Sequence, residues 1–179
     1  MADDIRTGPI ATDSPEFEAA EASVRSQIDA FINNNGSKTV DYFHRKLGKI
    51  IWDKCGMSRN EKQLKEAIRK VKALREAFYK EVFVPGTADS FNEPLAKALR
   101  VADFLELGEL FAKDALERTE SCGGHFREES QSPEGEALRD DANFTFVSAW
   151  EYKGEPSEAK LHKEELNYEN IELKTRSYK

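Results

Sequence analysis

The sequence predicts a mainly α-helical domain: an antiparallel bundle of three to four helices, then a long ordered loop and a small C-terminal β element. Apolar residues recur at three- and four-residue spacing in four segments between residues 14 and 118, which is the period of amphipathic helices. The connections between these segments are short, as in up-and-down bundles. Residues 144–152 then alternate with the period of a strand, so β structure is expected only near the C-terminus.

The first predicted helix begins at Ser14-Pro15, an N-cap residue followed by proline at the first helical position. It ends at Asn33–Gly36, because Asn and Gly tolerate the left-handed backbone of a helix end. The second predicted helix stops near Cys55-Gly56. The apolar faces are Phe17, Ala20, Val24, Ile28 and Phe31 in the first helix, and Val40, Phe43, Leu47, Ile50 and Ile51 in the second.

Two capping boxes predict the starts of the remaining helices, Ser58-x-x-Glu61 and Ser90-x-x-Glu93. The third helix ends at Val84-Pro85-Gly86 and the fourth continues to Arg118. Their apolar faces are Leu64, Ile68, Val71, Leu74, Phe78 and Val82, and Leu95, Leu99, Ala102 and Leu105. The fourth helix has a second apolar stripe, so we expect it to be the most buried helix of the bundle; this stripe is Phe104, Leu107, Phe111 and Ala115.

No hydrophobic period runs through Thr119–Asp141, which combines Cys, His, Arg and seven carboxylates around Gly123-Gly124. A stretch of more than about 15 residues without secondary structure is usually functional or disordered, and the mixed chemistry here favours function. A strand follows with Phe144, Phe146, Ser148, Trp150 and Tyr152, then a turn at Gly154–Ser157 and one or two short strands between Leu161 and Arg176. The predicted units are a flanking helix assignable to the edge of a preceding domain (1–36), the helical bundle (37–118), the loop (119–142) and short strands with a tail (143–179).

Composition excludes several classes of protein. The net charge of −7 equals that of residues 119–158 alone, with 3 basic and 10 acidic residues, so a positive footprint for nucleic acid is missing. No apolar run approaches the roughly 18 residues that span a bilayer, and no export or transit signal is visible. Two cysteines far apart in sequence predict no disulfide framework and favour a reducing compartment. We expect a soluble chain.

Metal binding is one interpretation of Cys122-x-x-His125, with Glu128 and Glu129 nearby. A closed zinc site needs four ligands, and the other Cys and His residues show no paired spacing; these are Cys55, His44 and His162. The sequence therefore predicts no metal site.

Catalysis by this loop also has a weak basis. His125 would need a pocket and an orienting carboxylate, Glu120 or Glu128, and a lone loop histidine is more often a structural hydrogen-bonding residue. Cys122 lacks the surroundings of a nucleophile elbow. The chain contains neither GxGxxG nor GxxxxGK[ST], so no known fingerprint for a dinucleotide or triphosphate is present.

The third predicted helix carries a basic stripe whose members share one face: Lys62, Lys65, Arg69, Lys72 and Lys80. One interpretation is docking to an acidic partner surface or an anionic head group. The other, which is the commoner case, is a solvated helix face.

Several segments, in order, resemble the C-terminal helical region of succinate dehydrogenase and fumarate reductase flavoprotein subunits. Ala98–Ala115 resembles the long helix of that region with its LEL-x-x-L pattern, and Glu117–Glu129, ERTESCGGHFREE, is similar to the motif R-x-ESRGxHxRxD/E. Where the family often has Arg after Glu-Ser, this chain has Cys122. Further matching segments are Val40–Gly56, Leu64-x-x-Ala67-Ile68, Leu74-Arg75 and the closing Arg176-Ser177-Tyr178.

The resemblance implies part of a flavoenzyme that oxidises succinate to fumarate or reverses the reaction. Electrons would pass through FAD to an iron–sulfur subunit and a membrane quinone site, with a membrane cytochrome b subunit as an indirect partner. Such a subunit lies peripherally on the cytoplasmic face of the inner membrane. The FAD-binding and catalytic residues of the family belong to upstream domains, so we expect no catalytic residue, no direct FAD contact and no activity in this segment alone.

The resemblance also implies a positioning role for the motif, in which the loop folds onto the flavin-binding domain through charged hydrogen bonds. The residues that match are Glu120, Ser121, His125, Arg127, Arg139, Asp140 and Asp141. The alternative is a freestanding helical adaptor that binds an acidic partner through the stripe Lys62, Lys65, Arg69 and Lys72. A flavin-binding sequence encoded in frame upstream or in an adjacent gene would favour the first interpretation.

Overall fold

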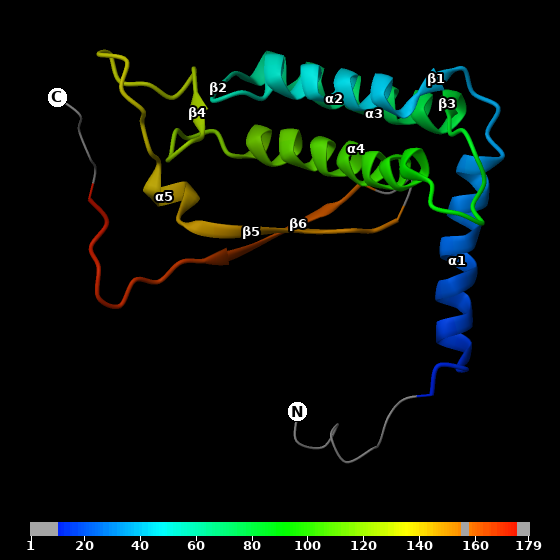
Figure 1. The fold of residues 1–179 in the computed structure, drawn as a ribbon. Coiled ribbons are helices and arrows are strands. Elements are labelled where there is room, and N and C mark those ends of the chain that lie inside the picture. The colour runs from blue at the N-terminus through cyan, green and yellow to red at the C-terminus, as the bar shows by residue number, and fades with distance from the viewer. Residues whose placement is uncertain (1–10, 155–157, 175–179) are drawn as a thin grey trace.

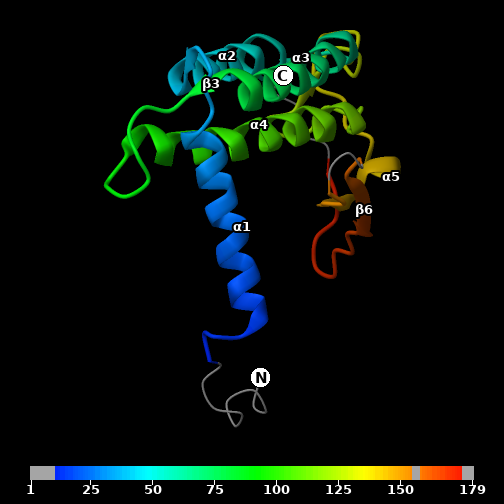
Figure 2. The ribbon, with the colours of Figure 1, turned by 90° about the vertical axis from the view of Figure 1, so that its right-hand side faces the viewer.

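Three long helices form the body of the molecule, and a fourth projects from one end. A computed structural model describes residues 11–154 and 158–174. Helices α2 (Val40–Lys54), α3 (Glu61–Glu81) and α4 (Glu93–Glu117) lie side by side with alternating direction (Figure 1). Helix α1 (Pro15–Ile32) stands away from the bundle and meets it near its C-terminal end (Figure 2). The predicted helical bundle is confirmed, with three bundled helices and one flanking helix.

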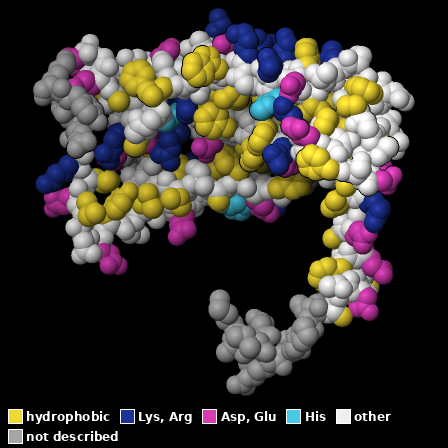
Figure 3. Space-filling view, viewed as in Figure 1, with side chains coloured by type: hydrophobic (Ala, Val, Ile, Leu, Met, Phe, Trp, Pro, Cys, Tyr) yellow, Lys and Arg dark blue, Asp and Glu magenta, His cyan; other side chains and the backbone are white. Residues whose placement is uncertain are grey.

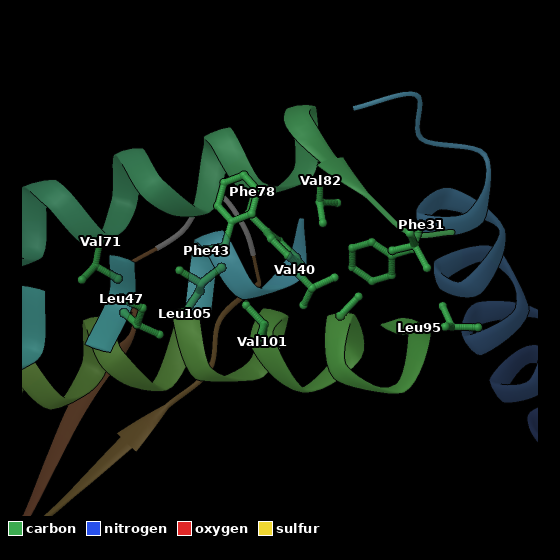
Figure 4. Packing of buried hydrophobic residues seen from close by; sticks show 12 residues of the cluster. Phe31, Val40, Phe43, Leu47, Val71, Phe78, Val82, Leu95, Val101 and Leu105 are labelled. Atoms are coloured by element: carbon green, nitrogen blue, oxygen red, sulfur yellow. The ribbon is translucent and has the colours of Figure 1, made fainter. Parts of the chain in front are cut away.

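The core of the bundle is built from the apolar faces predicted for the helices. Phe43 of α2 and Phe78 of α3 meet edge to face with ring centroids 5.2 Å apart, and Phe31 of α1 packs on Phe78 at 5.5 Å (Figure 4). Each fully buried side chain of this size contributes about 1.5–3 kcal/mol. Phe31 ties α1 to the bundle, while Phe17 and Val24 farther along its apolar face are exposed.

Helix α4 differs from the prediction in two respects. Leu99 and Ala102 of its first predicted stripe are only partly buried, and Ala98 and Val101 are buried in their place. Helix α4 has seven buried residues, against four in α3 and three in α2, so it is the most buried helix, as expected. Its inner stripe packs against α2 and α3 and comprises Leu95, Ala98, Val101, Leu105 and Ala112. The second stripe was predicted to be buried as well, but of its members only Ala115 is buried. Phe104, Leu107 and Phe111, here called the outer stripe, are exposed because α2 and α3 cover one side of α4 only.

Both predicted capping boxes are wrong by two residues. Helix α3 is capped by Asn60, whose Oδ1 accepts a hydrogen bond from the backbone N–H of Gln63 at 2.9 Å. Helix α4 is capped by Asn92 in the same way, through the N–H of Leu95 at 2.9 Å. Asn is as good an N-cap as Ser, and Ser58 serves a strand instead.

Short parallel strand pairs join the helix connections. Strand β1 (Lys38–Thr39) pairs with β3 (Val82–Phe83), and β2 (Ser58–Arg59) pairs with β4 (Phe126–Arg127). A Cβ atom at Gly36 would lie 2.1 Å from the carbonyl oxygen of Glu81, so only glycine lets the chain before β1 pass this close to the end of α3. None of these pairs was predicted.

The C-terminal β element is one hairpin. Strand β5 (Phe146–Glu151) pairs antiparallel with β6 (Lys160–Glu165), preceded by a short unpredicted helix, α5 (Asp141–Phe144). No further strand follows β6 in the part described, up to residue 174. Residues 155–157 of the predicted turn, and the closing Arg176-Ser177-Tyr178, lie outside the described residues. Among the helices described, none has both the length and the apolar character needed to cross a bilayer.

Candidate functional site

The loop at 119–141, here called the motif loop, is an ordered structure at the C-terminal end of α4. Cys122 and His125 form a tight turn, with their backbone N–H groups and carbonyls paired at 2.9 and 3.0 Å. Gly123 in this turn has φ +59°, a left-handed conformation that favours glycine. Strand β4 then runs beside β2, which attaches the loop to the connection between α2 and α3.

Arg127 holds the loop to the end of α4. Its guanidinium is buried, and its Nη1 donates to the carbonyl oxygens of Ala115 (3.1 Å), Leu116 (3.2 Å) and Arg118 (3.2 Å). Its Nε donates to the carboxylate of Glu129 at 3.1 Å. Carbonyls in the last turn of a helix have no intrahelical donors, and a positive charge at this end also interacts favourably with the helix dipole. Arg127 is therefore a cap for α4.

Glu120 and Ser121 are also buried and turned inward. The Ser121 hydroxyl accepts from the N–H of Arg127 at 2.8 Å and donates to its carbonyl at 3.2 Å. The Glu120 carboxylate accepts from the Arg118 guanidinium at 2.5 Å and from the N–H of Asp140 at 2.8 Å. These bonds connect the two ends of the motif loop to each other.

His125 is held at both ring nitrogens. Its Nε2 lies 2.7 Å from the carbonyl oxygen of Arg118, and its Nδ1 lies 2.7 Å from Nη1 of Arg59. A neutral ring that donates from Nε2 and accepts at Nδ1 fits both contacts. Burial lowers the pKa of His125 below its usual value, and the guanidiniums of Arg59, Arg127 and Arg118 act in the same direction.

An acid–base role for His125 therefore lacks a free nitrogen and an orienting carboxylate. Glu120 is bound to Arg118, while Glu128 accepts hydrogen bonds from Ser58 and Asn60, both at 2.8 Å. Cys122 is exposed and Cys55 is buried. Among the described residues no group of three Cys, His, Asp or Glu side chains is arranged to hold a metal ion.

The last part of the motif loop faces outward. Arg139 donates from Nε to Oδ1 of Asp141 at 2.9 Å, and Asp140 caps α5 through the N–H of Asn143. The structure thus brings all seven predicted residues into one loop but divides them. Glu120, Ser121 and Arg127 are buried, whereas His125, Arg139, Asp140 and Asp141 are partly exposed. Their predicted role in docking stays a prediction.

Two arginines of this site were missed in the sequence. The Arg118 guanidinium lies against the rings of Phe144 and Phe146, 5.4 and 5.1 Å from their centroids, and donates to both backbone carbonyls at 3.2 Å, so it joins the motif loop to the hairpin. Arg118 opens the motif R-x-ES, which is a signal that was available. Arg59 has no local signal, because it reaches His125 from a distant connection.

An ion cluster built around the buried carboxylate of Glu109 was also missed. The Glu109 carboxylate is only 4% exposed and accepts from Lys113 at 2.7 Å. Nη2 of Arg75 lies 3.3 Å from its Oε2, close enough for an ion pair but without hydrogen-bond geometry. Hydrogen bonds from Lys113 and Lys72 lower the pKa of Glu158 to about 2. Glu109 lies four residues after Leu105 and three before Ala112, so helical spacing alone assigns it to the buried face.

This cluster interrupts the basic stripe of α3. Lys72 points to Glu158 (2.7 Å) and Glu109 (3.6 Å), and Lys65 pairs with Glu61 on its own helix. Lys62, Lys65 and Arg69 remain as exposed members of the four-residue adaptor surface. The geometry therefore favours a solvated helix face over a continuous binding surface.

Comparisons with known proteins agree on one family. The sequence profile described as "Fumarate reductase flavoprotein C-term" matches residues 44–178. The Escherichia coli (strain K12) fumarate reductase flavoprotein subunit is 30% identical over 128 residues, which is 72% of this chain and 20% of that protein. The Helicobacter pylori (strain 26695) fumarate reductase flavoprotein subunit is 27% identical over 118 residues, 66% of this chain and 16% of that protein.

Solved structures show the same fold. A structure described as quinol-fumarate reductase with menaquinol molecules matches with a TM-score of 0.76 at 24% identity, over 93% of this chain and 28% of the other. The Mycobacterium smegmatis Sdh1 complex in its apo form matches with a TM-score of 0.68 at 24% identity, over 90% and 26%. The chain spans only 20% of the Escherichia coli relative. Because the profile matches most of its length, the chain belongs to the family of C-terminal domains of fumarate reductase and succinate dehydrogenase flavoprotein subunits.

Proposed function

We propose that this chain serves as the C-terminal domain of a flavoprotein that interconverts succinate and fumarate. Electrons would pass through FAD to an iron–sulfur subunit and on to a quinone site in the membrane, with the flavoprotein as a peripheral subunit. The proposal is supported by relatives that are fumarate reductase flavoprotein subunits. Because the chain spans 20% of the first of them, the residues that act on the substrate are expected outside it.

We expect no direct contact between FAD and the motif loop. The polar side chains of the motif loop already bind one another, and its Gly123-Gly124 pair forms a two-residue turn instead of a phosphate-binding loop. FAD supplies hydride and electron transfer wherever it is bound, and a protein contributes by binding and orienting it. We infer that another part of the flavoprotein holds FAD, and that this chain alone has no redox activity.

The contribution of this chain would be to pack on the flavin-binding domain through the motif loop. One observation supports this role: the buried residues of the motif loop hold its exposed residues in place. Arg127, Ser121 and Glu120 anchor the loop to α4 and to itself, and the turn at Cys122–Gly124 and the Arg139–Asp141 pair are left facing outward. A rigidly held exposed turn is suited to contact with a partner, since little order has to be gained on binding.

The test starts from the flavin-binding sequence encoded in frame before this chain or in a neighbouring gene. That protein, produced together with this chain, is expected to show flavin absorbance near about 450 nm and to oxidise succinate or reduce fumarate. This chain alone is expected to show neither. Turnover by the flavin-binding protein without this chain, or FAD bound by this chain alone, would overturn the proposal.

The adaptor interpretation predicts a different outcome. It requires no flavin-binding sequence beside the chain, and it requires binding to an acidic protein that is lost in Lys62→Ala and Arg69→Ala variants. Finding both would replace the proposal with an adaptor function.

A further inference from the structure

Helix α4 carries exposed apolar side chains that its own fold does not use. In the outer stripe, Phe104 is 42% exposed, Leu107 59% and Phe111 45%. Steps of three and four residues place the three side chains on one helix face. Hydrophobic side chains gather across the middle of this face of the molecule, over α2 and α4 (Figure 3). Contiguous exposed apolar surface of this kind marks interaction sites.

A wide, shallow groove with a volume of about 530 Å³ lies beside Leu107 and Phe111 of the outer stripe. Ile51 of α2 and Trp150 of β5 form its sides, together with Leu107 and Phe111. A Cβ atom at Gly108 would come within 3.1 Å of Leu47, so the glycine allows α2 and α4 to approach closely and leaves no side chain in the groove at this position.

The groove is suited to protein side chains, not to a small polar ligand. Asp114 is the one charged residue among the described residues that line it, and its Oδ1 already accepts a hydrogen bond from Nε1 of Trp150 at 2.9 Å. Small-molecule sites usually offer a few unsatisfied polar groups that orient the ligand. Aromatic residues in an apolar setting are instead typical of the energetically dominant part of protein interfaces.

The outer stripe is physically continuous with the motif loop. The guanidinium of Arg59 lies 5.0 Å from the ring centroid of Phe111 and also contacts Nδ1 of His125 at 2.7 Å. A partner that covers the exposed turn of the motif loop would therefore reach Phe111 through Arg59. The exposed apolar stripe of α1, with Phe17 and Val24, is farther away, since α1 and β4 lie at opposite ends of the bundle (Figure 1).

We propose that the outer stripe of α4, together with Ile51 and Trp150, is the surface on which the flavin-binding domain of the flavoprotein docks. This inference rests on the proposed function and names the face that it uses. Both the size and the chemistry of the surface favour this partner. The Escherichia coli relative contains this region as 20% of its length, so a much larger part of the same subunit is available to cover an apolar face. The docking surface would have apolar side chains at its centre and Arg59 and His125 at its edge.

Cysteine protection tests this surface in the assembled flavoprotein. Leu107→Cys and the control Phe91→Cys are made in a Cys122→Ser background, in which Cys55 is buried; the wild-type residues are 59% and 93% exposed. Reaction with a maleimide is compared between this chain alone and the assembled protein. Because thiol reaction depends on access, assembly is expected to slow labelling at Leu107→Cys about tenfold or more and at Phe91→Cys less than about twofold.

Each alternative gives a distinct result. Equal labelling of Leu107→Cys before and after assembly overturns the inference. Protection of Phe91→Cys without protection of Leu107→Cys also overturns it, because it places the contact at the connection between α3 and α4. If Leu107→Cys is protected without the flavin-binding domain, and more strongly at higher concentrations of this chain, a second copy of the chain covers the outer stripe and the inference fails. If the wild-type chain does not assemble with the flavin-binding domain at all, the proposed function fails first, and the labelling of Leu107→Cys is then unaffected by the added domain.

A charged variant gives an independent measurement. Leu107→Asp places a carboxylate on an exposed position, so the melting temperature of the chain is expected to stay within a few degrees of wild type. Its binding to the flavin-binding domain is expected to weaken by at least about tenfold, as for an interface residue of high energetic weight. Phe91→Asp is the control, and it should bind like wild type because Phe91 is 93% exposed and lies outside the outer stripe. Wild-type binding by Leu107→Asp would contradict the inference.

Discussion

The helical bundle and the motif loop are stabilised by opposite kinds of interaction. In the bundle, Phe31, Phe43 and Phe78 pack ring against ring in an apolar core. In the motif loop, buried Arg127 and Glu120 are held by hydrogen bonds to backbone groups and to other charges. Apolar packing tolerates exchange of side chains of similar volume, whereas a buried polar network fails when one partner is missing. The bundle should therefore set the stability of the domain, and the loop should set its shape at one end.

The largest expected effect is in the bundle. Phe78→Ala removes a fully buried ring that contacts both Phe31 and Phe43, and we expect a loss of about 3–5 kcal/mol in the free energy of unfolding. Urea denaturation measures it as a lower midpoint with an unchanged slope. Phe91→Ala is the control: this ring is 93% exposed, so its loss should change stability by less than about 0.5 kcal/mol. Similar midpoints for the two variants would show that the core is not where the structure places it.

The next effect tests the network of the motif loop. Arg127→Ala leaves the carbonyls of Ala115 and Leu116 without their side-chain donor and leaves His125 as the remaining donor to the carbonyl of Arg118, at an expected cost of roughly 3 kcal/mol. Amide hydrogen exchange should become faster in the last turn of α4 and in β4, and stay slow around Phe43. Arg127→Lys keeps the charge but loses the planar fork, so it should lie between wild type and Arg127→Ala. A uniform rise in exchange over the whole chain would argue against a local cap.

The bundle was predictable from sequence because its signals are local. The apolar spacing along α2, α3 and α4 places all three helices close to their observed bounds. The same spacing says nothing about what covers a stripe. The inner and outer stripes of α4 have equal periodicity, and only the positions of α2 and α3 decide that Leu105 is buried and Leu107 exposed. The capping boxes failed for a related reason, since Asn60 competes with Ser58 two residues away.

The motif loop was predictable only in part. The family resemblance identified Glu120, Ser121, His125 and Arg127 as a unit, and the structure brings them together. It gave no indication of Arg59, the partner of His125, because 66 residues separate the two and no local pattern connects them. The pairing of β2 with β4 is equally distant in sequence. Contacts of this kind arise from the packing of the bundle, which brings the two connections together.

Acid should weaken the motif loop before it affects the bundle. Burial and three guanidiniums lower the pKa of His125 in the folded state, so the unfolded chain binds the proton more readily. The contribution of neutral His125 is thus complete above the unfolded pKa of about 6.5 and is lost as the pH falls below it. Urea midpoints should decrease between about pH 7.5 and about pH 5.5 in wild type and decrease less in His125→Gln. A flat wild-type profile would contradict the assignment.

The smallest effect on stability is expected at the outward half of the motif loop. Arg139 pairs with Asp141 at 2.5 Å near the surface, and exposed pairs contribute about 0–1 kcal/mol, so Arg139→Ala should unfold within about 1 kcal/mol of wild type. Arg127 and Arg139 belong to the same loop, so the two variants compare an inward and an outward arginine directly. If the loop docks as proposed, Arg139→Ala should weaken assembly with the flavin-binding domain while the chain itself stays folded. A loss of stability as large as that of Arg127→Ala would mean that Arg139 supports the loop from within, and its exposed side would then not be a docking contact.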